Sequence, residues 1–289
     1  MNVSPLNRVI VIAQRRDLAV NRLAIPMVLE HIAARRYLMA VPASDVEVYR
    51  REMPSAVDIL SEESVLAQWN KDAIARTLPA KVAQRAGWYL QQFLKIELAM
   101  TCAPGERSLI LDGDTLPLRP LSFEDVDGRI GLYTGKEFHP PYFATIRRLL
   151  DLPRGAGYSY IAQCMCVRPV WIEALIDSIE RRSGTGWIES VLRSIPGDSV
   201  SEFSEFETIG TFVASRFPSE IYLKQRPWFR WGRGYFGGDE ELAPERLRKF
   251  AALYDFIALE SWDRGIKAWF RSRSQLAMAN LRQGQRLIP

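Results

Sequence analysis

The chain has 289 residues, a formal net charge of +4 and a sequence pI of about 9.0. This mild excess of positive charge suits anionic substrates or an anionic membrane face, and it does not indicate nucleic-acid binding. Hydrophobic residues make up 47% and charged residues 25%, as in ordinary soluble globular proteins. No stretch approaches the roughly 18 uninterrupted apolar residues of a transmembrane helix, and the N-terminal apolar run is too short for a secretory signal, so we expect a cytoplasmic protein.

Strand and helix patterns alternate through the first half of the chain. The apolar patterning predicts strands at 8–14, 37–41, 56–60 and 109–111, and helices at 18–31, 46–52 and 88–100. Such alternation is typical of an α/β fold in which helices cover a mainly parallel sheet.

Shorter elements are predicted beyond residue 120. The patterns indicate strands at 129–133, 158–167 and 251–259, and helices at 141–150, 170–182, 187–194 and 205–215, followed by a C-terminal helix. The segment 218–239 is rich in Pro, Gly and aromatic residues and is expected to be mostly loop. No linker divides the chain convincingly, so residues 1–289 are expected to form a single domain.

The most informative segment follows the apolar run 109–111, where Asp112 and Asp114 are separated by Gly113. A buried strand of an open α/β sheet places the residues that follow it at the carboxyl edge, where such sheets bind ligands. Residues i and i+2 of an extended chain point to the same side, so both carboxylates can reach one point, while Gly113 lets a ligand approach the backbone. Converging carboxylates favour Mg²⁺ or Mn²⁺, whose remaining ligands are often phosphate oxygens. The segment therefore predicts either a metal-bridged diphosphate, such as a nucleotide-sugar, or only a polar turn after a strand.

Two other kinds of catalytic centre fit the sequence less well. Haloacid-dehalogenase-type phosphatases also carry two aspartates after an apolar strand, but their pattern asks for Thr or Val at position 116, where this chain has Leu116. A zinc site would need more Cys or His at short spacing than this chain offers. The cysteines, which are Cys102, Cys164 and Cys166, are expected to be buried thiols.

Further polar residues are candidates for the same site. Lys95 lies one helical turn from Gln92 on a predicted helix. Its ammonium group either binds a diphosphate or faces solvent. Glu205 and Glu207 begin another predicted helix, where they complement the helix dipole or supply a general base for an acceptor hydroxyl. His139 is a metal ligand, an acceptor contact or simply a loop residue.

Two segments combine aromatic and basic residues. In the segment 226–237, aromatic residues can stack on sugar rings and arginines can bind phosphates. Alternatively, the aromatic rings pack against the core. We treat its Gly-x-Gly-x-x-Gly match at 232–237 as chance, because no buried strand precedes it. The C-terminal end is basic and amphipathic, which fits either a peripheral membrane contact or a helix packed on its own domain, and its basic residues are Lys267, Arg271, Arg273, Arg282 and Arg286.

Four segments, in the same order along the chain, resemble a bacterial glycosyltransferase-like family of uncharacterised domains, similar to GT-A enzymes of surface-polysaccharide synthesis. They are 87–95, the acid strand 109–120, the loop with Glu137 and His139, and 203–210. The resemblance implies a GT-A-like, Rossmann-type sheet that binds a nucleotide-sugar through Mn²⁺ or Mg²⁺. It also implies that 1–120 is mainly nucleotide-binding and that 121–289 forms mainly the acceptor side and a C-terminal helix.

The resemblance carries roles over to particular residues. Asp112 and Asp114 match the Asp-x-Asp metal and diphosphate motif. Many GT-A enzymes add a C-terminal histidine as a metal ligand, but this chain has none after His139, so water or phosphate oxygens would complete the shell of the ion. The other residues implied are the nucleotide-binding Gln14, Arg15 and Asp17 after the first strand, and Glu205 or Glu207 as the catalytic or acceptor-side acid.

The implied reaction moves a sugar from a nucleoside-diphosphate sugar to a hydroxyl of a glycan or lipid-linked saccharide. Glu205 is the first candidate for the base if the reaction inverts the anomeric centre, and it orients the acceptor if configuration is retained. One alternative is a sugar-phosphate nucleotidyltransferase, against which the loop 14–22 counts because it has arginines and no glycine. The other is a non-catalytic glycan- or partner-binding protein on the same fold.

Overall fold

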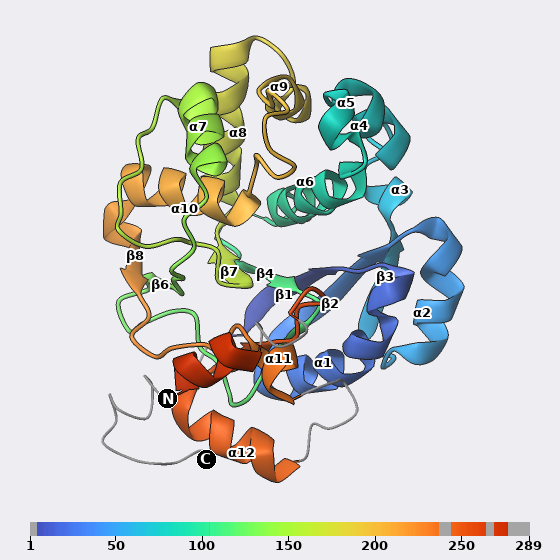
Figure 1. Ribbon diagram of the computed structural model, residues 1–289, viewed down its shortest axis with the longest axis vertical. Coiled ribbons are helices and arrows are strands. Elements are labelled where there is room, and N and C mark those ends of the chain that lie inside the picture. Colours follow the sequence, from blue (N-terminus) through green and yellow to red (C-terminus); the bar gives the residue numbers. More distant parts are fainter. Residues whose placement is uncertain (1–4, 104, 237–243, 264–268, 277–289) are drawn as a thin grey trace.

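A five-stranded sheet forms the centre of the molecule (Figure 1). The computed structural model describes residues 5–103, 105–236, 244–263 and 269–276. In the sheet order β3-β2-β1-β4-β7, the first four strands run parallel and β7 is antiparallel to β4. The strands are β1 (Leu6–Ile12), β2 (Ala34–Val41), β3 (Val57–Ser61), β4 (Ser108–Asp112) and β7 (Cys164–Val167). A mainly parallel sheet flanked by helices confirms the predicted α/β fold class.

The register brings the carboxyl ends of neighbouring strands to one edge of the sheet. Ile12 at the end of β1 is level with Ala40 of β2 on one side and with Asp112 of β4 on the other. The strand order runs outward from β1 in both directions, which makes the gap between β1 and β4 the switch point of the sheet. Open α/β sheets hold ligands outside such a point, so the crevice faces the turn after Asp112.

Helices cover both faces of this sheet (Figure 1). Helix α6 (Ala86–Met100) packs on β1 and β4, whereas α1 (Leu18–His31) and α2 (Val46–Glu52) lie on the opposite side. A further group stands beside the β7 edge, consisting of α7 (Pro140–Leu150), α8 (Pro169–Ser183), α9 (Trp187–Arg193) and α10 (Glu205–Arg216). Within the described ranges, no helix combines the length and apolar character needed to cross a membrane.

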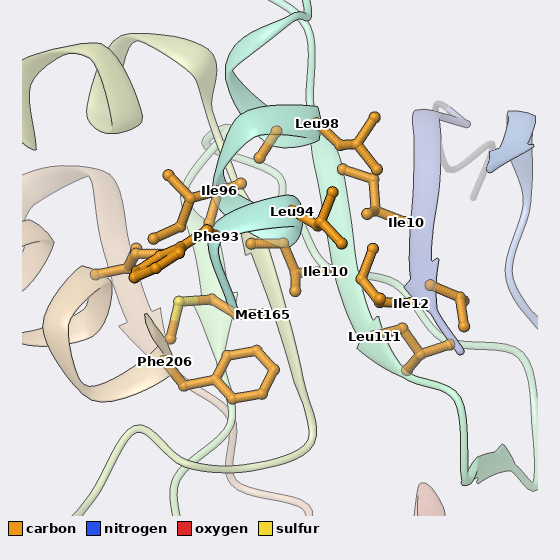
Figure 2. Close-up of a cluster of buried hydrophobic side chains, with 14 of the residues drawn as sticks. Ile10, Ile12, Phe93, Leu94, Ile96, Leu98, Ile110, Leu111, Met165 and Phe206 are labelled. Carbon is orange, nitrogen blue, oxygen red and sulfur yellow. The ribbon is translucent and has the colours of Figure 1, made fainter. Parts of the chain in front are cut away.

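Rows of apolar side chains on α6 build the core between helix and sheet (Figure 2). Leu94 and Leu98 lie toward Ile10 of β1, while Phe93 points toward the side of Met165. All of these side chains are buried. Lys95 sits next to these rows on the same helix and is therefore drawn into the protein as well, with only 8% of its surface exposed.

Short elements complete the fold. Two small sheets pair β5 (Thr115–Pro117) with β9 (Phe256–Ala258) and β6 (Ile130–Leu132) with β8 (Ile221–Leu223). The remaining helices are α3 (Glu62–Val65), α4 (Lys71–Thr77), α5 (Ala80–Ala83), α11 (Gly232–Phe236) and α12 (Pro244–Leu253), with 3-10 turns at Arg15–Asp17, Ala43–Asp45 and Pro218–Glu220.

Several predicted elements need correction. Of the strand expected at 158–167, only β7 is extended, because Gln163 takes a positive φ of 63° directly before it. The segment 218–239 contains β8 and α11 rather than mostly loop, although 237–239 lie outside the described residues. The strand expected at 251–259 is the end of α12 followed by β9. Residues 269–276 are helical, as expected near the C-terminus.

The packing of α10 yields a stability prediction. A methyl group added to Gly210 would lie 2.1 Å from Cγ of Tyr160. We expect Gly210→Ala to lower the free energy of unfolding by about 1–3 kcal/mol through overpacking, despite the helix preference of alanine. In Gly155→Ala, the matched control, the added methyl has no atom within 4 Å. Urea denaturation measures both variants, and an unchanged Gly210→Ala protein would contradict this packing.

Candidate active site

A cavity of about 520 Å³ opens at the carboxyl ends of β1 and β4. Its walls come from the loop after β1, from α6, from the turn after β4, from the start of α10 and from the chain after β9. Within the described part of the chain, six carboxylates and four cationic side chains line it: Asp17, Asp112, Asp114, Glu137, Glu205 and Glu260, with Arg16, Arg85, Lys95 and Arg230. Because acids outnumber bases here, the cavity suits a ligand that brings positive charge.

The turn that carries the two aspartates is anchored from below. Asn21 Nδ2 of α1 donates a hydrogen bond to the carbonyl of Gly113 at 2.7 Å, and Tyr49 Oη lies 2.9 Å from Asn21 Oδ1. A Cβ at Gly113 would come within 2.8 Å of Asn21 Nδ2 and 3.2 Å of Val11 Cγ1. Glycine is therefore needed for close packing beneath the turn, and Gly113 also lines the cavity above it.

Lys95 joins the turn after β4 to the start of α10. Its Nζ forms ion pairs with Asp112 Oδ1 and, at 2.6 Å, with Glu205 Oε1. Burial alone would lower the pKa of Lys95, but the two carboxylates outweigh it and raise that pKa, so the ammonium stays charged. Burial also raises the pKa of Glu205, which Lys95 partly offsets. One buried cation thus pairs with the buried Glu205 and the partly exposed Asp112, which come from distant parts of the chain.

Asp114 contributes a second, less compensated negative charge. Its Oδ1 is buried and has no hydrogen-bond partner among the described residues. Burial, reinforced by Asp112 and Asp17, raises the pKa of Asp114 to about 7. Burial likewise raises the pKa of Glu260 to about 8, against the opposing charge of Arg230 and with further contributions from Asp114 and Asp112. A cation bound at Asp114 would relieve both groups.

A third cluster holds the far wall of the cavity. Arg230 pairs with Glu137 at 2.5 Å and with Glu260 at 2.9 Å, and Gln163 Nε2 donates to Glu260 Oε1 at 3.2 Å. Gln163 also accepts a backbone hydrogen bond from the N–H of Asp112 at 2.9 Å. A non-glycine residue with positive φ is uncommon, and such strain concentrates at functional sites. In this conformation, the Gln163 carbonyl connects the start of β7 to the turn formed by residues 112–114, which we call the acid turn.

The predicted nucleotide-binding residues divide between two neighbouring cavities. Asp17, Gln92 and Lys95 line the cavity of the acid turn. Gln14 and Arg15 line a second cavity of about 640 Å³ at the ends of β1, β2 and β3. Arg16 lines both, so the two cavities lie on either side of this residue of the loop after β1.

Two predicted catalytic residues have structural partners. The carboxylate of Glu207 accepts hydrogen bonds from Ser159 Oγ and, at 3.3 Å, from the N–H of Tyr160. His139 Nε2 lies 2.6 Å from the carbonyl of Ser201, and its ring packs edge-on against Tyr142. Neither Glu207 nor His139 is among the described residues that line the cavity of the acid turn, whereas Glu205 is. Glu205 is 4% exposed and is further held by a hydrogen bond from its N–H to Gln92 Oε1 at 3.0 Å.

The aromatic and basic segments fold mostly onto their own domain. Trp228 is buried and stacks on Phe256, whereas Trp262, which sequence reasoning missed, lines the cavity with 53% of its surface exposed. The guanidinium of Arg271 lies 5.2 Å from the ring of Trp231, and that of Arg273 lies 5.3 Å from the ring of Tyr235. Of the other basic residues near the C-terminus, Lys267, Arg282 and Arg286 lie outside the described residues.

Glu260 and Gln163 also went unrecognised in the sequence. Glu260 follows the apolar run 256–259, just as Asp112 follows 109–111, so a strand ending in an acid was a usable signal. The N–H of Leu259 donates to the carbonyl of Asp114 at 2.9 Å, which sets Glu260 beside the acid turn. Nothing in the local pattern around Gln163 predicts a positive φ.

Asp112 and Asp114 fit a divalent cation of the Mg²⁺ or Mn²⁺ type. Both offer hard oxygen ligands, and the buried Oδ1 of Asp114 lacks another partner among the described residues. Within those residues, no group of three or more His, Cys, Asp or Glu is arranged to hold an ion. Two carboxylates completed by phosphate oxygens and water match the way proteins hold Mg²⁺ with a phosphate substrate.

The chain belongs to a family of unknown function (DUF6492), whose match spans residues 19–216. No curated protein matches it. Among solved structures, the chain is similar to apo mouse xyloside xylosyltransferase 1, with 12% identity, a TM-score of 0.47, and coverage of 90% of this chain and 99% of that one. It is also similar to the galactosyltransferase LgtC in complex with donor and acceptor sugar analogs, with 12% identity, a TM-score of 0.45, and coverage of 98% and 97%. An active-site mutant of LgtC gives 12% identity, a TM-score of 0.49, and coverage of 94% and 95%.

Removing the shared cation tests the buried ion cluster. Lys95→Met leaves the buried Glu205 and the partly exposed Asp112 without their cation, and we expect the free energy of unfolding in urea to fall by about 2–4 kcal/mol. The double variant Lys95→Met/Glu205→Gln should recover part of that loss, because it removes one of the stranded charges. Lys81→Met, at an exposed lysine of α5, is the control. A loss below about 1 kcal/mol would argue against this ion cluster.

The raised pKa of Asp114 predicts how stability without metal depends on pH. Because the folded state holds this proton up to about pH 7 and the unfolded chain releases it near 3.8, the metal-free protein loses stability as pH rises through that window. Asp114→Asn should therefore be about 1–3 kcal/mol more stable than the parent at pH 8 and equal to it near pH 4. Urea unfolding in EDTA measures this, with the exposed Asp127→Asn as control. A constant difference at all pH values would contradict the assignment.

Proposed function

We propose that this protein is a metal-dependent glycosyltransferase that moves a sugar from a nucleoside-diphosphate sugar to a hydroxyl of a glycan or lipid-linked saccharide. One observation carries the proposal: Asp112 and Asp114 line a carboxylate-rich cavity at the switch point of a mainly parallel sheet, next to a second cavity at the ends of β1, β2 and β3. An elongated donor with a nucleoside at one end and a sugar at the other fits two neighbouring cavities that share Arg16 in their walls. The diphosphate would lie between them, near Arg16.

The loop after β1 supports this orientation of the donor. Arg16 faces both cavities. Its guanidinium pairs with Asp17 at 3.7 Å, but its side chain is 71% exposed and remains accessible to a phosphate. In this arrangement residues 1–120 supply most of the nucleotide side, and 121–289 supply most of the acceptor side. A divalent cation held by Asp112 and Asp114 would neutralise charge on the departing diphosphate.

The side chains of the chain itself would keep the acid turn in place during the reaction. Lys95 fixes Asp112 through one oxygen, Oδ1, which leaves Oδ2 for a ligand. Arg230 and Gln163 hold Glu260 at the opposite wall. These buried contacts preorganise the charged groups, so that little rearrangement is needed when the donor binds.

In this proposal, two carboxylates act on the acceptor hydroxyl. As the bond from the anomeric carbon to the diphosphate breaks and the bond to the acceptor oxygen forms, the hydroxyl proton must leave. Glu205 stays paired with Lys95 and is suited to accept a hydrogen bond that orients the hydroxyl. Burial raises the pKa of Glu260, so its carboxylate, when ionised, accepts a proton more readily than an exposed glutamate does and is suited to taking up that proton.

Exposed aromatic residues support a saccharide acceptor near a membrane. Trp262 presents its ring at the cavity, where a sugar can stack, and Trp231 packs edge-on against it at 5.4 Å. Trp269 and Phe270 are exposed on the helix at 269–276, beside Arg271. We include in the proposal a cytoplasmic location with peripheral contact at the inner membrane face, which would bring the enzyme to lipid-linked acceptors.

Calorimetric titration of nucleoside diphosphates with and without Mn²⁺ tests this function. We expect binding that requires Mn²⁺ and falls about 100-fold or more in Asp112→Asn and in Asp114→Asn, because each loses a charged metal ligand. The control is Asp127→Asn, on an exposed loop. Release of nucleoside diphosphate from a donor sugar should show the same pattern. If no nucleoside diphosphate binds, a non-catalytic binding protein replaces this function; if binding ignores both aspartates, the metal role is wrong.

A further inference from the structure

The cavity at the ends of β1, β2 and β3 has the features of a site for a flat, polar-edged ring. It measures about 640 Å³, within the usual range for small-molecule sites. Leu66 and Leu90, both buried, and the half-buried Trp69 form apolar wall, while Lys71 stands at the rim. Aromatic and aliphatic walls of this kind hold a nucleobase by its faces and leave its edge to be read by polar groups.

One polar group in this cavity is buried and lacks a partner. Glu62, the first residue of α3, is 9% exposed, and its Oε1 is buried with no hydrogen-bond partner among the described residues. The cap of α3 does not use it, because Ser61 Oγ already accepts the N–H of Ser64 at 3.1 Å. Leaving a carboxylate oxygen buried and unbonded is unfavourable, so such a group calls for an explanation.

The neighbouring acid Asp45 shows the contrast. Asp45 Oδ2 accepts a hydrogen bond from the N–H of Arg15 at 3.0 Å and thereby orders the loop after β1. Glu62 has no such structural task in the described residues. Burial raises the pKa of Glu62 to about 7, with smaller contributions from Glu63 and Asp45. A ligand that donates hydrogen bonds to this carboxylate would replace the solvation that the fold has removed.

We propose, building on the function above, that this cavity binds the base of the donor nucleotide and that Glu62 selects guanine. An ionised carboxylate only accepts hydrogen bonds, and its two oxygens match two adjacent N–H donors. Guanine offers such a pair, N1–H and the N2 amino group. Uracil offers one N–H between two carbonyl acceptors, and the outer carbonyls would face the carboxylate oxygens. Adenine and cytosine pair their amino group with a ring-nitrogen acceptor, so each leaves one carboxylate oxygen without a donor.

Titration of GDP, UDP, ADP and CDP into the full chain with Mn²⁺ tests the proposal. We expect GDP to bind at least about 10-fold more tightly than the other three, because they leave Glu62 incompletely paired. Glu62→Gln should weaken GDP binding about 10- to 100-fold, the effect of losing one bidentate contact to a base, and change UDP binding little. The control is Glu47→Gln, at an exposed acid of α2. The thermal midpoint of Glu62→Gln at pH 8 should not fall below that of the parent, which shows that the variant folds.

The outcomes separate this inference from the function on which it rests. Tighter binding of UDP, ADP or CDP than of GDP overturns the assignment of guanine while leaving the glycosyltransferase proposal intact. Equal loss of GDP affinity in Glu47→Gln and Glu62→Gln, or no loss in either, overturns the role of Glu62. Absence of binding by all four nucleotides to the parent protein overturns both.

Discussion

The ion pairs made by Lys95 are the interaction on which the rest of the site depends. They join Asp112 at the end of β4 to Glu205 at the start of α10, two positions separated by about a third of the length of the chain. A buried ammonium without partners would be very costly, and so would the buried carboxylate of Glu205 alone. The three side chains therefore stabilise one another only when α6, β4 and α10 are all in their final positions.

The charges left after this pairing explain why the cavity suits a ligand. Lys95 forms ion pairs with two acids, and Arg230 forms ion pairs with Glu137 and Glu260. Asp114 keeps a buried oxygen without a partner among the described residues. The raised pKa values of Asp114 and Glu260 have the same origin, which is burial of negative charge beside more negative charge. A divalent cation accompanied by a diphosphate would balance such a site, because it brings positive charge and oxygen ligands together.

Hydrophobic periodicity predicted the main elements because it reports local burial. The helices α1 and α2 have the predicted bounds, and the parallel strands differ from prediction by a few residues at their ends. The short helices α3 to α5 were not predicted. Two of them, α3 and α5, have four residues each, too few to establish a helical period. Gln163 cut a predicted strand short through its backbone conformation, to which apolar patterning is blind.

The sequence by itself determined the α/β sheet and the place of Asp112 and Asp114 at the end of a buried strand, because both follow from patterns within a few neighbouring residues. Only the tertiary structure decided which other side chains meet them. It brought Glu205 and Glu260 to the cavity wall and left Glu207 bonded to Ser159, although Glu205 and Glu207 are two positions apart on one helix. The physical reason is that such choices depend on which face of an element packs against which neighbour, and that packing is settled by contacts between residues far apart in the chain.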